Sequence, residues 1–141
     1  MTNTIKKGAL VGLLCAILGA IQMFWFLPNG QSCLDARSGL LDAIFVFMSL
    51  QFFLVVIIYV IIRTRLRFYI LIALLCTFWF FVNKNEFTYR LACWSTYTTS
   101  DILYYTFQKS IIPIATCISI FIVGYLYLGK LTVRNDIEKN N

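Results

Sequence analysis

LLDAIFVFMSLQFFLVVIIYVII, residues 40–62, is the stretch that decides the fold class of this chain. Its single charged residue, Asp42, lies near the start, and polar side chains such as Ser49 and Gln51 are isolated between apolar ones. About 20 helical residues cross a hydrocarbon core of roughly 30 Å, so a run of this length predicts a transmembrane helix. A transmembrane strand would alternate apolar and polar residues, and this run does not.

Three further apolar blocks flank this stretch, at residues 8–27, 68–82 and 111–128. The block at 68–82 is short, but Arg67 can snorkel at one end and Asn83 can reach the lipid headgroups at the other, so we expect it to span as well. Of the 141 residues 60% are apolar and 13% charged, whereas about a quarter are charged in soluble domains. The sequence therefore predicts an all-α membrane protein, a single domain of four transmembrane helices over residues 1–141.

The charged residues predict how the four helices are oriented. One side of the membrane would hold the N-terminal segment, the loop 63–67 and the C-terminal tail, with eight cationic and two anionic residues: Lys6, Lys7, Arg63, Arg65, Arg67, Lys130, Arg134 and Lys139, with Asp136 and Glu138. The other side, with outer loops 28–39 and 83–110, carries four of each sign: Arg37, Lys84, Arg90 and Lys109, with Asp35, Asp42, Glu86 and Asp101. The whole net charge of +6 falls on one side, so the positive-inside rule predicts that both termini are cytoplasmic. The excess of basic residues thus indicates the orientation of the helices in the membrane and gives no support to nucleic-acid binding.

Small, polar and aromatic residues within the blocks predict how the helices pack. The first block repeats small residues at four-residue spacing: Gly8, Gly12, Ala16 and Ala20. Such a face lets another helix approach closely, either inside the bundle or from a partner protein. The polar residues Gln22 and Gln51 are expected to bridge helices, and the aromatic run Trp79–Phe80–Phe81 to lie in a headgroup belt.

Residues 101–108 are amphipathic and lead into the last block. Ser100 can cap a helix there, and Asp101 favours its positive N-terminal end. Either a short helix lies at the outer interface before the fourth span, or the fourth helix begins early. Pro113 is expected in the first turn of the final span, where its missing N–H is tolerated.

The chain offers little to a catalytic centre. It has no histidine, no nucleotide-binding glycine motif and no nucleophile-elbow motif. No charged residue lies near the middle of a block, where ion pathways usually place one. We therefore expect neither an enzyme nor a transporter, and neither a metal nor a cofactor.

The five cysteines fall into two groups. Cys15, Cys76 and Cys117 lie within the apolar blocks, whereas Cys33 and Cys93 lie one in each outer loop. An oxidising outer compartment favours a disulfide between the last two, worth about 4 kcal/mol for the segment it closes, and two free thiols are the alternative. The quinone-coupled thiol oxidases of bacterial inner membranes need a C-x-x-C pair that this chain lacks, so a redox relay would have no partner thiol.

Three short segments stand out in the predicted arrangement of four spans with both termini inside: the basic loop Arg63–Thr64–Arg65–Leu66–Arg67, the Glu–hydrophobic–Thr segment Glu86–Phe87–Thr88, and Asp101 before Ile102–Leu103. This arrangement and these segments resemble the immunity proteins that protect bacteria against pore-forming colicins, especially the colicin A group. The resemblance covers the C-terminal two-thirds of the chain, from the second span onward. The chain lacks the longer N-terminal region of the larger members, and its Cys33 and Cys93 do not match the family pattern.

This resemblance implies a multi-pass protein of the bacterial inner membrane that binds the pore-forming domain of a bacteriocin within the lipid bilayer and keeps its channel closed. It implies a recognition surface on the outer loop, formed by Glu86, Arg90, Trp94 and Asp101, with Tyr104 and Tyr105 at the headgroups. The alternative is that the loop only caps the bundle and the aromatic residues are belt residues. Two other functions remain open: a prophage superinfection-exclusion protein, and an accessory subunit of a larger membrane complex.

Overall fold

The structure is a computed structural model that describes residues 2–27, 33, 39–94 and 96–138, with the backbone alone at 2–3, 94 and 130–138. The described residues form four long helices and one 3₁₀ turn, and they contain no strand: α1 (Thr2–Phe26), α2 (Leu40–Ile61), α3 (Leu66–Arg90), η1 (Ala92–Trp94) and α4 (Thr99–Glu138). The prediction of an all-helical chain is confirmed for this part.

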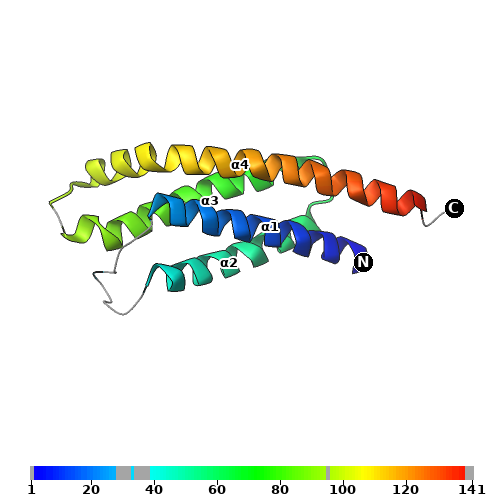
Figure 1. Cartoon of the computed structure of the whole chain (residues 1–141), viewed down its shortest axis with the longest axis horizontal. Coiled ribbons are helices and arrows are strands. Elements are labelled where there is room, and N and C mark those ends of the chain that lie inside the picture. Colours follow the sequence, from blue (N-terminus) through cyan, green and yellow to red (C-terminus); the bar gives the residue numbers. More distant parts are fainter. Residues whose placement is uncertain (1, 28–32, 34–38, 95, 139–141) are drawn as a thin grey trace.

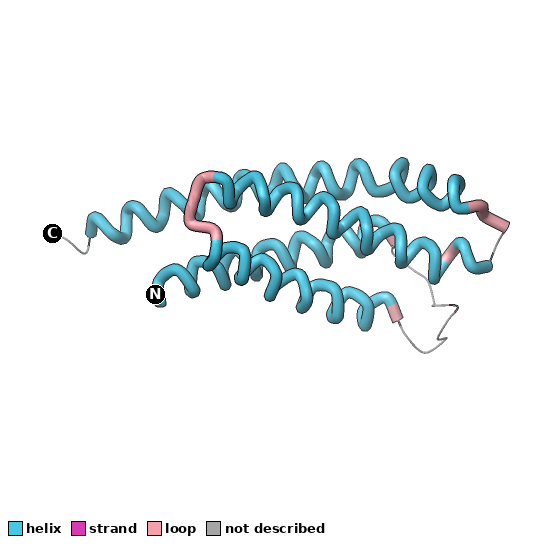
Figure 2. The backbone as a smooth tube through the Cα atoms, turned by 180° about the vertical axis from the view of Figure 1, so that it is seen from behind, coloured by secondary structure: helices cyan, strands magenta, loops and turns pink. Residues whose placement is uncertain are grey.

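The four helices form an up-and-down bundle, shown from opposite sides in Figure 1 and Figure 2. α1 lies against α2 and α4, and α3 lies against α4 and α2. The start of α1 and the end of α4 are at the same end of the bundle (Figure 1). We call this the inner end, and the end that holds the α1–α2 and α3–α4 connections the outer end.

All four helices contain a segment long and apolar enough to cross a membrane. Their apolar side chains continue around the outside of the bundle, where Phe45 is 76% exposed on α2 and Val123 is 69% exposed on α4. A helix that is apolar on all sides is typical of a membrane span, because lipid covers the outward face. Length and composition thus indicate a multi-pass membrane protein.

Two helices extend far beyond the predicted spans, and the outer loop 83–110 is much shorter than expected. α3 continues from the predicted end at 82 to Arg90, and α4 begins at Thr99 rather than at 111. The length of an apolar run reflects the thickness of the hydrocarbon core, whereas a helix can continue beyond it wherever its side chains find packing partners. The other outer loop, 28–39, lies mostly outside the described residues.

The start of α4 decides between the two predicted arrangements. α4 is one continuous helix, so its N-terminal part is an extension and not a separate interfacial helix. The cap is Thr98 rather than the predicted Ser100: the Thr98 hydroxyl accepts the Asp101 N–H at 3.3 Å, and an Asp101 carboxylate oxygen accepts the Thr98 N–H at 3.0 Å. This reciprocal pair satisfies backbone donors at the helix start. Pro113 therefore lies inside the helix and not in its first turn.

The small residues of α1 lie against α2. A Cβ added at Gly12 would come within 3.0 Å of side-chain atoms of Phe52 and of Val56 on α2. Gly8 likewise lies against Tyr59, while Ala16 and Ala20 are half-buried. Of the two uses that the spacing allowed, the described contacts are those of packing within the bundle.

A further glycine of α1, Gly19, is packed more tightly than Gly8 or Gly12, and it gives a direct test of the packing. A Cβ there would overlap the sulfur of Met48 and lie 2.8 Å from Oε1 of Gln51, whose amide is hydrogen-bonded on both sides. Overpacking of this kind costs about 1–3 kcal/mol. We expect Gly19→Ala to lower the free energy of unfolding by that amount in mixed micelles titrated with SDS and followed by tryptophan fluorescence.

Gly129→Ala is the matched control, because a Cβ at Gly129 meets nothing within 4 Å. Replacing an unhindered helical glycine by alanine leaves stability unchanged or raises it by up to about 1 kcal/mol. Equal losses in the two variants would contradict the packing described here.

Candidate functional site

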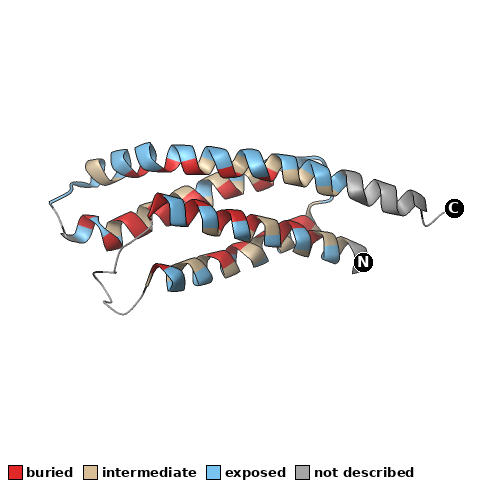
Figure 3. Ribbon diagram, viewed as in Figure 1, coloured by how far each residue is buried: buried red, intermediate tan, exposed pale blue. Residues whose placement is uncertain are grey.

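One face of α3 carries the buried residues around which the site is built. They recur every three or four residues along the helix: Leu71, Leu75, Trp79, Val82, Asn83, Glu86, Phe87 and Arg90. The pattern begins in the apolar block and continues without a break into the segment predicted to be a loop. Figure 3 shows the buried faces of the four helices turned toward one another. The outer half of this buried face includes the polar side chains of Asn83, Glu86 and Arg90, which are expensive in a membrane bundle unless each group is bonded.

The first polar layer joins α1, α2 and α3. The indole N–H of Trp79 donates to Oε1 of Gln51 at 2.8 Å, and Nε2 of Gln51 donates to the backbone carbonyl of Cys15 at 2.7 Å. Both side chains are almost completely buried. The prediction that Gln51 bridges helices is therefore confirmed, and the prediction that Trp79 is a headgroup-belt residue is wrong.

The second polar layer joins α1, α3 and α4. Nδ2 of Asn83 donates to Oε1 of Gln22 and to Oγ of Ser110, each at 3.0 Å. In the other direction, Nε2 of Gln22 donates to Oδ1 of Asn83 at 3.4 Å. All three side chains are at most 1% exposed. Asn83 is thus an interior residue and does not reach the headgroups as predicted. Thr106 lies one turn before Ser110 on α4, and its buried hydroxyl has no hydrogen-bond partner in the described part of the chain.

The third polar layer is the Glu86–Arg90 ion pair on the last turns of α3. Nε of Arg90 donates to the carboxylate of Glu86. Nη2 of Arg90 donates to the backbone carbonyl of Gly39, just before α2, at 3.1 Å. Glu86 is 7% and Arg90 4% exposed. These two residues therefore lie on a buried helix face and not in a loop as predicted: they neutralise each other and attach the end of α3 to the residue before α2, and their part in recognition stays a prediction.

The outer end is closed by the disulfide between Cys33 and Cys93, as the position of one cysteine in each loop predicted. The bond spans 60 residues in the sequence, and the Cys33 N–H donates to the carbonyl of Tyr89 on α3 at 2.9 Å. The three other cysteines are free thiols within the helices. The covalent bond holds the α1–α2 connection against the end of α3.

A chain of aromatic rings covers the same end. Phe26, Phe87, Tyr97, Tyr105 and Tyr104 follow one another with ring centroids 5.3–6.5 Å apart. Tyr104 is 64% and Tyr105 38% exposed, so this row leads from the core to the surface of α4. Of the other predicted recognition residues, Asp101 caps its own helix, and the side chain of Trp94 lies outside the described residues.

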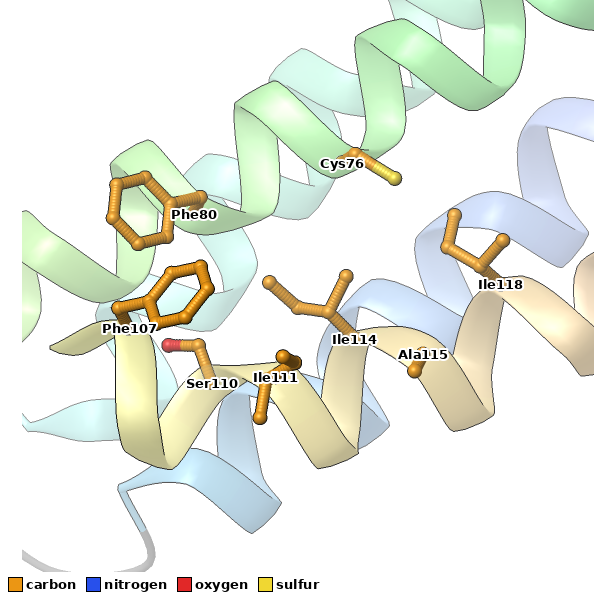
Figure 4. Close-up of a pocket in the computed structure, with 8 residues that line it drawn as sticks. All are labelled: Cys76, Phe80, Phe107, Ser110, Ile111, Ile114, Ala115 and Ile118. Carbon is orange, nitrogen blue, oxygen red and sulfur yellow. The ribbon is translucent and has the colours of Figure 1, made fainter.

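A groove of about 430 Å³ lies between α3 and α4 next to this buried face, and we call it the α3–α4 groove (Figure 4). Its lining is apolar apart from Ser110: Cys76, Phe80, Phe107, Ser110, Ile111, Ile114, Ala115 and Ile118. The rings of Phe80 and Phe107 meet edge to face at its outer limit, with centroids 6.5 Å apart. Sequence reasoning missed this groove, because its residues are ordinary lipid-facing types in two separate spans.

The groove offers shape and apolar surface rather than reactive groups. The described residues contain no cluster of three or more histidine, cysteine or acidic side chains that could hold a metal ion. Small residues such as Ala115 allow a third helix to approach closely, as membrane helices do when they pack. Comparison with family models, curated proteins and solved structures finds nothing that matches this chain.

The bond between Asn83 and Ser110 can be tested against an unbonded hydroxyl on the same helix. Ser110→Ala removes one acceptor of Asn83, and interhelical bonds in membranes contribute about 0.6 kcal/mol on average and up to about 1.7. Thr106→Val removes a buried hydroxyl that has no partner among the described residues, so stability should stay equal or rise. We expect this difference in SDS-titrated unfolding, and equal losses would contradict the network.

The disulfide predicts a simple pattern of cysteine modification. Alkylation of the SDS-denatured chain should add three labels without a reductant and five after reduction, because three of the five cysteines are free. Intact mass spectrometry counts the labels. Five labels without reduction would show that Cys33 and Cys93 are thiols, and Cys33→Ser should give four.

Proposed function

We propose that this chain is an immunity protein of the bacterial inner membrane, which binds the membrane-inserted helices of a pore-forming bacteriocin and keeps the channel closed. The observation that carries the proposal is the α3–α4 groove, a concave apolar surface on the lipid-facing side of the bundle that lies next to the buried polar side chains of α3. A pore-forming toxin inserts hydrophobic helices into the bilayer, so an apolar groove suits its chemistry.

The outer part of α4 adds an exposed surface next to the groove. Tyr104 and Phe107 are 64% and 59% exposed, and Tyr104 belongs to the aromatic row that continues into the core. Asp101 stays half-exposed at the helix start while it caps the helix. Tyrosine gives contact area and a hydrogen-bonding hydroxyl at little cost in conformational entropy, which suits recognition at the level of the headgroups.

The buried ion pair changes which residues serve recognition on this proposal. Glu86 and Arg90 hold the outer end in one shape, while Asp101, Tyr104, Tyr105 and the groove provide the contact surface. Breaking a buried pair by removing one partner costs about 3–5 kcal/mol, so a toxin that needed either charge would first have to disrupt α3. On this proposal Glu86 and Arg90 thus act by positioning.

The proposed orientation places the inner end in the cytoplasm, because the excess of basic residues lies there. The outer end then faces the periplasm, where Cys33 and Cys93 can stay oxidised. A toxin that enters from outside meets this end first. The rival function of an accessory subunit depended on the small-residue face of α1, and Gly8 and Gly12 of that face lie against α2.

Potassium efflux from sensitive cells tests the proposal. Cells that express the chain should retain potassium when challenged with one pore-forming bacteriocin from a panel, while nuclease bacteriocins should still kill them. Ala115→Trp fills the groove and should reduce the tolerated dose of that toxin at least about tenfold, which corresponds to about 1.4 kcal/mol of lost binding. Membrane levels of the chain are matched by immunoblot.

Ala73→Trp is the control, because Ala73 is exposed on α3 and is not part of the groove lining. It should protect like the original chain. Equal loss with both variants would remove the groove from the mechanism, and unchanged efflux across a broad panel would exclude immunity to those toxins. Survival of phage challenge would favour superinfection exclusion, and a stoichiometric partner in mild detergent would favour the accessory subunit.

A further inference from the structure

A second cavity, at the inner end of the bundle, has a different chemistry from the groove. It measures about 240 Å³ and is lined by residues of all four helices, including two cations and two tyrosines: Lys7 of α1, Tyr59 of α2, Arg67 of α3 and Tyr125 of α4. Arg67 is the second residue of the α3 span, and it follows the exposed residues Arg63 and Arg65 of the basic loop. The cavity therefore lies at the inner end of this span, where lipid headgroups would lie on the proposed orientation.

Arg67 is held in a fixed position in this cavity. Nε of Arg67 donates to the hydroxyl of Tyr125, and Nη1 of Arg67 donates to the backbone carbonyl of Tyr59, both at 3.3 Å. The guanidinium carbon lies 3.8 Å from the centre of the Tyr59 ring. These contacts use two of the five N–H donors of the guanidinium. A planar, oriented guanidinium with remaining donors is well suited to bind phosphate.

The described residues supply no carboxylate to neutralise these cations. The ion pair among them is Glu86–Arg90, at the opposite end of the bundle. Asp136 is the nearest acidic residue along α4, and seven residues of helix place its backbone about 10 Å beyond Gly129 along the helix axis. Two half-buried cations in one cavity thus call for an anionic ligand.

The remaining walls of the cavity indicate what carries the anion. Leu10, Val11 and Leu128 line it, and Leu10 is 54% exposed on the outer surface of α1, where lipid tails would lie. We propose that this cavity is a phosphate site that holds the headgroup of an anionic phospholipid, with Arg67 and Lys7 on the phosphate and the apolar wall along the start of an acyl chain. Basic cavities between helices on the cytoplasmic side are suited to such lipids. The site is separate from the α3–α4 groove and does not depend on it.

Native mass spectrometry of the full chain in mild detergent tests the site. The probes are phosphatidylglycerol, phosphatidylcholine as a zwitterionic lipid, and inorganic phosphate in large excess as a competitor. We expect one phosphatidylglycerol to be retained, phosphatidylcholine to bind at least about tenfold more weakly, and inorganic phosphate not to displace the lipid. Displacement by inorganic phosphate would show a free-phosphate site and overturn the lipid assignment.

Variants of equal net charge distinguish a site from general attraction. Arg67→Gln and Lys7→Gln should each weaken phosphatidylglycerol binding by about fivefold to tenfold. Arg65→Gln, at an exposed position of the same basic loop outside the cavity lining, should change it by less than about twofold. Equal effects of Arg65→Gln and Lys7→Gln would overturn the proposal. Lys7→Gln keeps the Arg67 contacts, so it remains informative if Arg67→Gln does not fold.

Discussion

The buried polar side chains of α3 need partners that only the neighbouring helices can supply, and this requirement organises the bundle. Hydrocarbon offers no water to an amide or an indole N–H. Apolar packing selects partners weakly, because lipid tails are as apolar as leucine. Trp79 bonds to α2, Asn83 to α1 and α4, and Arg90 to the residue before α2. Together these contacts determine the rotation of α3 about its axis and its height in the bundle.

The same contacts explain why the groove lies where it does. The bond between Asn83 and Ser110 holds α3 and α4 close together near the outer end. Phe80 and Phe107 then meet on the lipid side, and beyond them the isoleucine side chains of α4 line an open space (Figure 4). The groove is therefore a consequence of polar contacts between α3 and α4 on the side that faces the bundle core, although its own surface is apolar apart from Ser110.

The sequence was informative about the number of helices and their class, and less so about their ends and rotation. α2 was predicted at 40–62 and is found at Leu40–Ile61, because its apolar run ends where the helix ends. α3 continues to Arg90 because Phe87 and Arg90 find partners beyond the apolar block. The residue types at positions 79 and 83 suggested the membrane–water interface. A residue type alone, however, does not show whether its side chain points toward the lipid or toward the bundle core. The spacing of Leu71, Leu75, Trp79, Asn83 and Phe87, four residues apart, was the sequence signal that could have revealed one continuous helix face.

The disulfide was predictable for a reason that did not apply to the groove. Two cysteines in two outer loops form a pair by chemistry alone, once the topology is known. A groove depends instead on the distance between two helices, which is set by contacts between residues 27 and 61 positions apart in the sequence. Periodicity within one helix contains no information about such distances.

The burial of Glu86 and Arg90 also bears on how the proposed immunity could be specific. An apolar groove attracts any apolar helix and discriminates through shape, so close fit against small residues such as Ala115 must distinguish one toxin from another. Near the headgroups water is present, and there the hydroxyl of Tyr104 and the carboxylate of Asp101 can discriminate by hydrogen bonding. A hairpin entering from the outer side would meet the polar surface first and the groove second. Recognition at the polar surface would then precede binding in the bilayer. The Glu86–Arg90 ion pair would hold this polar surface and the groove in a fixed relative position.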